Sequence, residues 1–266
     1  MKSIASLLSA AALGAALLLS PGVAHAAALN YVALGDSYAS GVGTRTYIAD
    51  SGSCQRSTKA YPYLDATRLG ADLTFVACSG ARVADVTANQ LSAVTSAANR
   101  ITVQVGGNDA GFSSVITECA KPAWLADCDG AINNAQATIN NTIPGRLNTL
   151  YSSIRSRAAT AKVIVVGYPR LFNGTDCNAG TFFSAAEMTR LNQTADLLNA
   201  KIAASASTAG FTFINPTSAF IGHAVCGSPE WINGLSNPVS ESYHPNTTGQ
   251  AAYANLLAPA LTSSKA

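Results

Sequence analysis

Four residues with the side chains or backbone that acyl transfer needs stand in short segments of small and polar residues. They are Ser37 in "GDS", Gly80 in "CSGAR", Asn108 in "GGND" and His244 in "SYHP". A serine hydroxyl is a weak nucleophile at neutral pH, and a neutral imidazole is a base that titrates in the useful range. The backbone N–H groups of Ser37 and Gly80 and the side-chain amide of Asn108 can stabilise the oxyanion that forms at an attacked acyl carbon. The pattern predicts acyl transfer through Ser37.

Each of these segments, taken alone, is also typical of an ordinary turn. The presence of all four segments in one chain favours a catalytic site. The sequence after residue 26 holds only two histidines, His223 and His244, and one of them lies in such a segment. Two aspartates, Asp36 and Asp109, adjoin Ser37 and Asn108. We expect structural roles for both, since aspartates in tight turns commonly bond their own backbone.

Five apolar runs precede or separate these segments and are rich in Val, Ile, Thr and Phe. Their apolar character is continuous rather than alternating, which predicts strands buried on both faces at 31–34, 73–78, 101–107, 162–169 and 211–216. The clearest helical pattern between them begins with Ser184 and Glu187 in capping-box spacing. We expect its apolar stripe to be core packing and not a site: Met188, Leu191, Ala195, Leu198 and Ile202.

Strands that alternate with helices predict an α/β fold, with a parallel sheet covered on both faces. In such sheets ligands bind beyond the carboxyl ends of the strands. Ser37, Gly80 and Asn108 follow the first three predicted strands, so we expect them to meet at one edge of the sheet. No repeat or linker divides the sequence, and we expect residues 27–266 to form a single domain.

The first 26 residues have the pattern of a secretory signal peptide, with Lys2, an apolar stretch over 4–19, Pro21 and a small-x-small site that ends at Ala26. We expect cleavage after Ala26 or after Ala28 and a secreted, extracellular protein. The alternative is a membrane anchor, but the apolar stretch is shorter than the roughly 20 residues that a bilayer needs.

The six cysteines are an even set, which in an exported chain favours disulfides over metal ligands. Six cysteines allow about 15 pairings, and chain order favours the pairs in which each bridge staples a loop to its neighbour: Cys54–Cys78, Cys119–Cys128 and Cys177–Cys226. We expect no metal ion and no cofactor, since the sequence has no P-loop, dinucleotide fingerprint or cluster of metal ligands.

The net charge is +2, and charged residues make up 11% of the chain against 48% hydrophobic residues. No basic patch indicates a nucleic-acid partner. Such a sparsely charged surface tolerates apolar partners. We expect transient contact with lipid surfaces, and we also expect a monomer that acts on an ester substrate.

The sequence resembles the SGNH, or GDSL, hydrolase family, whose four named residues match Ser37, Gly80, Asn108 and His244 in order. The six cysteines and the segments "GGNDAGF", "CSGAR", "VVGYPR" and "SYHP" are similar to those of secreted bacterial lipases, esterases and phospholipases A1. The resemblance implies a three-layer α/β/α fold with a five-stranded parallel sheet. It also implies that Ser37 is the nucleophile, that His244 is the base and later the acid, and that Ser37, Gly80 and Asn108 form the oxyanion hole. In that subgroup the three disulfides pair sequentially.

The sequence departs from the family at the acid of the triad. Much of the family has aspartate three residues before the histidine, where this chain has Glu241, whose side chain is one methylene longer. In similar secreted members a main-chain carbonyl two residues before the histidine orients the ring, and that position is Ser242 here. Both alternatives stay open. We slightly favour the Ser242 carbonyl, with Glu241 turned toward solvent or an arginine.

Three functions follow from this pattern. The first is a secreted serine hydrolase that cleaves carboxylic ester bonds of lipids, as a lipase, an esterase or a phospholipase A1. The second is a secreted carbohydrate acetyl esterase, and the third, a non-catalytic binding protein, is disfavoured by the complete set of four residues. Large apolar side chains that can line an acyl pocket are Trp124, Trp231, Tyr168, Leu171, Phe172, Phe182 and Phe183. For the two tryptophans, the alternative is that they anchor disulfide-bounded loops to the core.

Overall fold

A five-stranded parallel sheet forms the middle layer of the protein, as a computed structural model that describes residues 29–263 shows. The strand order is β2-β1-β3-β4-β5. The strands are β1 (Asn30–Gly35), β2 (Asp72–Phe75), β3 (Arg100–Gln104), β4 (Lys162–Val166) and β5 (Thr212–Ile214). The predicted signal peptide, residues 1–26 with possible extension to Ala28, lies outside the described residues.

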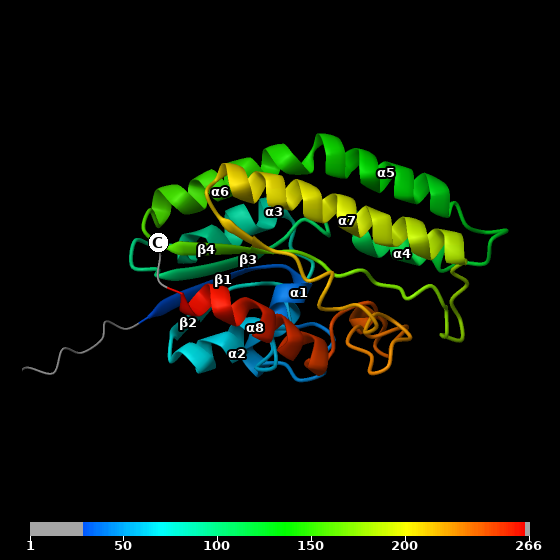
Figure 1. The fold of residues 1–266 in the computed structure, drawn as a ribbon, viewed down its shortest axis with the longest axis horizontal. Helices are drawn as coiled ribbons and strands as arrows, with labels where there is room; N and C mark the ends of the chain where they lie inside the picture. The colour runs from blue at the N-terminus through cyan, green and yellow to red at the C-terminus, as the bar shows by residue number, and fades with distance from the viewer. Residues whose placement is uncertain (1–28, 264–266) are drawn as a thin grey trace, which may run out of the picture.

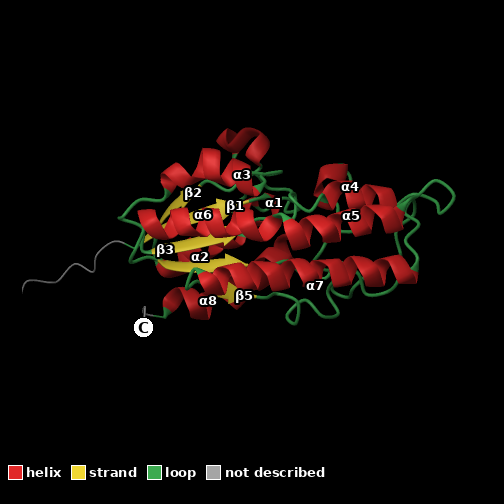
Figure 2. Ribbon diagram, turned by 90° about the horizontal axis from the view of Figure 1, so that it is seen from above, coloured by secondary structure: helices red, strands yellow, loops and turns green. Residues whose placement is uncertain are grey.

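Helices cover both faces of this sheet (Figure 1, Figure 2). One face carries α3 (Val83–Asp85), α4 (Phe112–Cys119), α5 (Cys128–Asn141), α6 (Ile143–Arg157) and α7 (Ala185–Thr208). The other carries α1 (Ser37–Ser40), α2 (Tyr61–Leu69) and α8 (Thr247–Thr262). The predicted three-layer α/β/α fold is confirmed. Within residues 29–263, none of the helices combines the length and the apolar character needed to span a bilayer.

All five predicted strands are present, but four of them end earlier than the apolar runs do. β2 ends at Phe75, β3 at Gln104, β4 at Val166 and β5 at Ile214, because the chain then turns away from the sheet to build loops. The prediction of burial on both faces holds for β1, β3 and β4. It is wrong for β2 and β5, whose side chains are partly exposed because these two strands form the edges of the sheet.

The long helix α7 starts where its capping box predicts. Ser184 Oγ accepts a hydrogen bond from the Glu187 N–H at 3.2 Å, and the Glu187 carboxylate accepts one from the Ser184 N–H at 2.7 Å. These two bonds satisfy donors that would otherwise be left without partners at the first turn. The helix then runs for 24 residues along the sheet.

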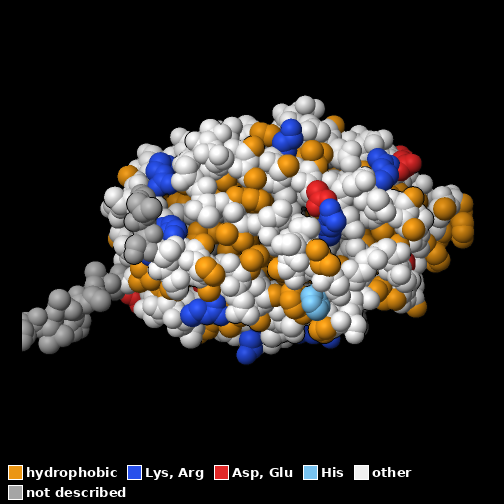
Figure 3. Space-filling view, viewed as in Figure 1, with side chains coloured by type: hydrophobic (Ala, Val, Ile, Leu, Met, Phe, Trp, Pro, Cys, Tyr) orange, Lys and Arg blue, Asp and Glu red, His pale blue; other side chains and the backbone are white. Residues whose placement is uncertain are grey.

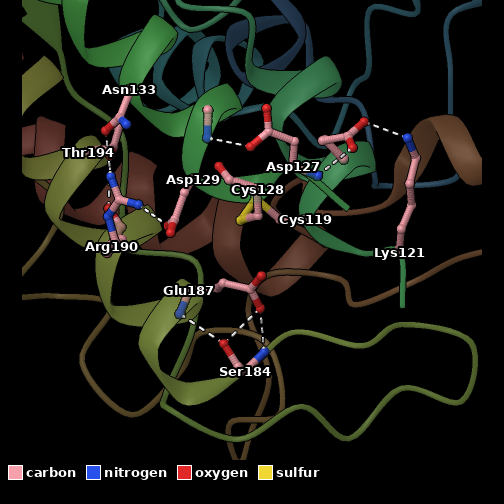
Figure 4. Close-up of a disulfide and its surroundings, with 12 residues drawn as sticks. Cys119, Lys121, Asp127, Cys128, Asp129, Asn133, Ser184, Glu187, Arg190 and Thr194 are labelled. Atoms are coloured by element: carbon pink, nitrogen blue, oxygen red, sulfur yellow. Dashed lines mark hydrogen bonds and ion pairs between the residues drawn. A yellow bond between two sulfur atoms is a disulfide. The ribbon is translucent and has the colours of Figure 1, made fainter. Parts of the chain in front are cut away.

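Three disulfides hold loops outside the sheet, and they are the sequential pairs expected: Cys54–Cys78, Cys119–Cys128 and Cys177–Cys226. The first ties the 49–54 segment to the segment that carries Gly80. The second closes the loop between α4 and α5 (Figure 4), and the third joins the loop before α7 to the segment after β5. No cysteine in the described part of the chain is free.

Candidate active site

Ser37 lies at the carboxyl end of β1, in the sharp turn that starts α1. Asp36 caps this helix by accepting the Tyr38 N–H at 2.9 Å. The turn needs glycine at Gly35, where φ is +144° and a Cβ atom would lie 2.4 Å from the carbonyl oxygen of Gln104. A side chain cannot be accommodated there without moving β3, so the glycine fixes the path that presents Ser37.

His244 lies in the loop before α8 and meets Ser37 across the edge of the sheet. Its Nε2 is 2.8 Å from Ser37 Oγ, and its Nδ1 is 2.9 Å from the carbonyl oxygen of Ser242. With the proton on Nδ1, the ring donates to Ser242 and leaves Nε2 free to accept the Ser37 hydroxyl proton. The residues next to this pair are also joined, because the Tyr38 hydroxyl donates to the Tyr243 carbonyl at 2.7 Å.

The imidazole is held in its neutral form. Burial lowers the pKa of His244 to about 4, and the bond to the Ser242 carbonyl and the charge of Glu241 oppose this lowering only in part. A neutral imidazole is the form that can take a proton, so the ring is ready to act as a base at neutral pH.

Glu241 does not contact His244 through a hydrogen bond. Its carboxylate accepts the Tyr47 hydroxyl at 2.7 Å and the Arg45 Nε–H at 3.1 Å. The side chain is 2% exposed. It is therefore turned toward an arginine, as expected, but the alternative of a solvent-facing glutamate is wrong. Between the two groups considered for orienting the ring, the Ser242 carbonyl is the one in contact with Nδ1.

Asn108 and Gly80 are brought together by a bond between their segments. The side-chain amide of Asn108 donates to the Ala81 carbonyl at 3.1 Å, which leaves its second N–H available. Gly80 has φ of +79°, and a Cβ atom there would meet nothing within 4 Å, so open space lies beside it. In the described part of the chain, the backbone N–H groups of Ser37 and Gly80 have no acceptor. The N–H groups of Ser37 and Gly80 and one amide N–H of Asn108 are thus not used by other groups in the described part of the chain.

The two neighbouring aspartates have long-range partners. Asp36 also accepts the Tyr168 hydroxyl at 2.5 Å, and burial raises its pKa to about 7. Asp109 accepts the Val83 N–H at 2.9 Å and pairs with Arg146 at 2.8 Å. The expectation of bonds to their own backbone is right for Asp36, which caps its own helix, and wrong for Asp109, which joins α3 and α6 to the Asn108 turn.

A narrow apolar cavity of about 70 Å³ opens beside Ser37 and Asn108, between α4, α5 and α7. Among its walls are Val115 and Ile116 of α4, Ala135 and Ile139 of α5, and Leu191 and Ala195 of α7. The α7 stripe therefore lines a site as well as packing in the core, which corrects the sequence prediction. The contributions of α4 and α5 were missed, because an apolar helix stripe looks the same whether it faces the core or a cavity.

The predicted pocket residues divide into three groups. Tyr168 and Leu171 line the cavity, whereas Phe172 and Phe183 pack against each other with ring centroids 4.8 Å apart. Trp231 packs edge-to-face on Phe220 and stacks on His223, so it anchors its loop to the core. Trp124 and Phe182 do neither, since they are 81% and 55% exposed.

The profile of the GDSL-like lipase/acylhydrolase family matches residues 33–252 of the chain. A lipase of Streptomyces rimosus is 42% identical in a 254-residue alignment that covers 91% of this chain and 94% of the relative. Among solved structures, the extracellular lipase of Streptomyces rimosus superimposes with a TM-score of 0.82 at 42% identity, over 88% of this chain and all of the other. Phospholipase A1 of Streptomyces albidoflavus NA297 gives the same TM-score at 40% identity, over 87% of this chain and 98% of the other.

Proposed function

The chain belongs to the GDSL-like lipase/acylhydrolase family of carboxylic ester hydrolases, and from that premise we propose that Ser37 and His244 carry out its reaction on lipid esters. The observation that carries this proposal is the Ser37–His244 contact of 2.8 Å at the mouth of an apolar cavity. The relatives named lipase and phospholipase A1 support the same substrate class.

In the first half of the reaction, Ser37 Oγ attacks the ester carbonyl carbon while His244 Nε2 takes the hydroxyl proton. The N–H groups of Ser37 and Gly80 and the amide of Asn108 stabilise the negative oxygen of the tetrahedral intermediate. When that intermediate collapses, the bond to the alcohol oxygen breaks and His244 returns the proton to the leaving alcohol. Water, activated by the same imidazole, then hydrolyses the acyl-enzyme and releases the carboxylic acid.

The Ser242 carbonyl replaces the triad acid in this proposal. It fixes the tautomer of His244 and the direction of Nε2, which are the orienting tasks of the usual carboxylate. A neutral carbonyl stabilises the imidazolium less than a carboxylate does. The Glu241 carboxylate supplies additional negative charge from a distance, because it raises the pKa of His244 without bonding to it.

The apolar cavity is the acyl site in this proposal. Its walls are apolar side chains from three helices, a lining that suits a hydrocarbon chain and extends over more residues than an acetyl group would contact. The alternative of a carbohydrate acetyl esterase is less well supported for that reason. We also infer that residues 27–266 are exported, since the chain carries three disulfides and a related lipase is described as extracellular.

A panel of p-nitrophenyl esters from acetate to palmitate, with phosphatidylcholine and acetylated xylan, tests the substrate class. We expect kcat/KM to rise with acyl length beyond acetate, and Ser37→Ala to abolish turnover on every ester while the fold is retained. Ala195→Leu, which narrows the cavity, should shift the preference toward shorter chains. The matched control is Ala204→Leu on the exposed face of the same helix, which should leave the profile unchanged. A preference for acetylated xylan, or full activity of Ser37→Ala, would overturn the proposal.

A further inference from the structure

The loop between α4 and α5 presents large apolar side chains to solvent. Trp124 is 81% exposed and Leu125 is 65% exposed. The loop projects from one end of the long axis of the molecule, where hydrophobic side chains gather on the surface (Figure 1, Figure 3). A tryptophan in this position gains little free energy from burial in the folded protein. Exposed apolar side chains that lie together indicate a binding surface.

A third exposed side chain lies at the same end. Phe182 is 55% exposed and comes two residues before Ser184, the cap of α7. The second turn of α7 and the first turn of α5 are joined by the Arg190–Asp129 pair, close to the Cys119–Cys128 disulfide (Figure 4). We call Trp124, Leu125 and Phe182 the apolar tip.

The loop is held in place without burying these side chains. The Cys119–Cys128 disulfide brings the two ends of the loop to a Cα separation of 4.5 Å. Inside it, the Leu125 N–H donates to the Pro122 carbonyl at 2.8 Å, and the Asp127 N–H donates to the Glu118 carboxylate at 2.9 Å. A loop that is already ordered loses little conformational entropy when it binds, so its exposed side chains can contribute most of their burial free energy to the contact.

We propose that the apolar tip inserts into the surface of a neutral or zwitterionic lipid aggregate and holds the enzyme there. Tryptophan and other apolar side chains are suited to the boundary between headgroups and acyl chains. The charge around the tip favours this kind of surface over an anionic one. Lys121, in the same loop, is paired with Glu118, and Arg190 of α7 is paired with Asp129, so the positive charge of both is offset by a carboxylate.

The position of the tip connects it to the acyl cavity. The α4 and α5 helices, which the loop joins, also supply cavity walls, and Ala135 lies seven residues after Cys128 along α5. At about 1.5 Å per residue, this part of the cavity wall lies roughly 10 Å along the helix from the start of α5, where the loop ends. A tip seated at a lipid surface therefore keeps the acyl site within reach of that surface. This inference rests on the proposed lipid substrate, but its test does not require hydrolysis.

The test measures binding of the Ser37→Ala protein, which leaves the lipid intact, to large unilamellar vesicles of phosphatidylcholine by co-sedimentation. Adding Trp124→Ala and Leu125→Ala should weaken vesicle binding by about tenfold or more, because apolar burial scales with the area removed from water. Ile221→Ala, at a side chain that is 71% exposed elsewhere on the protein, is the matched control and should change nothing. Raising the salt concentration should not release the protein, since the contact is apolar.

A second measurement uses the chain without tip substitutions. On addition of vesicles, tryptophan emission of the Ser37→Ala protein should shift to the blue and be quenched by brominated lipid, because Trp124 is the exposed tryptophan. Unchanged emission, undiminished binding of the tip variant, or equal loss in Ile221→Ala would overturn the proposal. In the active protein, the tip variant should keep its turnover of soluble p-nitrophenyl acetate. If the active protein hydrolyses no lipid ester while the tip still binds vesicles, the proposed substrate fails and the tip proposal stands.

Discussion

Replacing Glu241 by glutamine separates a role in catalysis from a role in folding. The substitution keeps an oxygen that can accept the Tyr47 hydroxyl but removes the charge that Arg45 pairs with. It leaves the Ser242 carbonyl, 2.9 Å from His244 Nδ1, where it is. We expect Glu241→Gln to lower kcat by less than tenfold, which corresponds to an increase in the activation free energy of less than about 1.4 kcal/mol. Neutralising a triad acid costs far more, on the order of 10⁴-fold.

Stability should respond more than catalysis does. Glu241 is buried, but Arg45 is 63% exposed, so solvent screens the pair and its own contribution is at most about 1 kcal/mol. The amide NH₂ group of the new glutamine would face the Arg45 guanidinium. Both groups are hydrogen-bond donors, so their contact lowers the free energy of unfolding by a comparable amount. The sum of about 1–2 kcal/mol corresponds to a fall in Tm of roughly 2–8 °C for a chain of this size.

The assay combines kcat on a soluble p-nitrophenyl ester with thermal unfolding of the same preparation. Ser242→Ala is the control for the carbonyl, because it removes the hydroxyl that accepts the Ser236 N–H at 2.9 Å and keeps the main-chain oxygen. Ser242→Ala should leave kcat nearly unchanged, whereas His244→Ala should abolish activity. A loss of several hundredfold in a well-folded Glu241→Gln protein would refute the reasoning and return Glu241 to the triad.

Three further predictions concern the base, the oxyanion donors and the disulfides. Because burial lowers the pKa of His244, the imidazole stays neutral down to about pH 4, so kcat/KM of the free enzyme should fall in acid with a midpoint near 4; a midpoint near 6.5, in protein shown to be folded, would contradict the described burial. Asn108→Ala should lower kcat by roughly 10²–10³ with little change in KM, and steady-state kinetics that show the reverse would assign Asn108 to substrate binding. Reduction should lower Tm substantially, because each bridge contributes about 2–4 kcal/mol, and alkylation of the denatured, unreduced protein should label no cysteine.

The elements of the fold could be predicted from the sequence because local patterns encode them. The continuous apolar run of β1 and the Ser184–Glu187 capping box each act within a few residues. The order of the strands could not be predicted, since it depends on which edges pair after the crossovers form. The exposed sides of β2 and β5 follow from that order, so they were missed for the same reason.

The candidate site could be predicted in part. Ser37 and Asn108 are recognisable because they follow predicted strands, and His244 because it is one of only two histidines after residue 26. The segments of all three resemble those of a known family. The partners of the two aspartates were not recognisable, because Tyr168 lies 132 residues from Asp36 and Arg146 lies 37 residues from Asp109. The same limit applies to the cavity, whose apolar walls have no local signal that distinguishes them from the core.

The Ser37–His244 contact joins residues 207 positions apart, one after the first strand of the sheet and the other after the last. If Ser37 is the nucleophile and His244 the base, as we propose, a chain made from its N-terminus completes its nucleophile long before its base exists. Until the segment before α8 has been made and has docked against α1, Ser37 is an ordinary unactivated hydroxyl. Hydrolysis thus begins only when nearly the whole polypeptide is in place, and no partial product can attack lipid during synthesis. Recovery of esterase activity is, for the same reason, a direct report that the last part of the chain has joined the first.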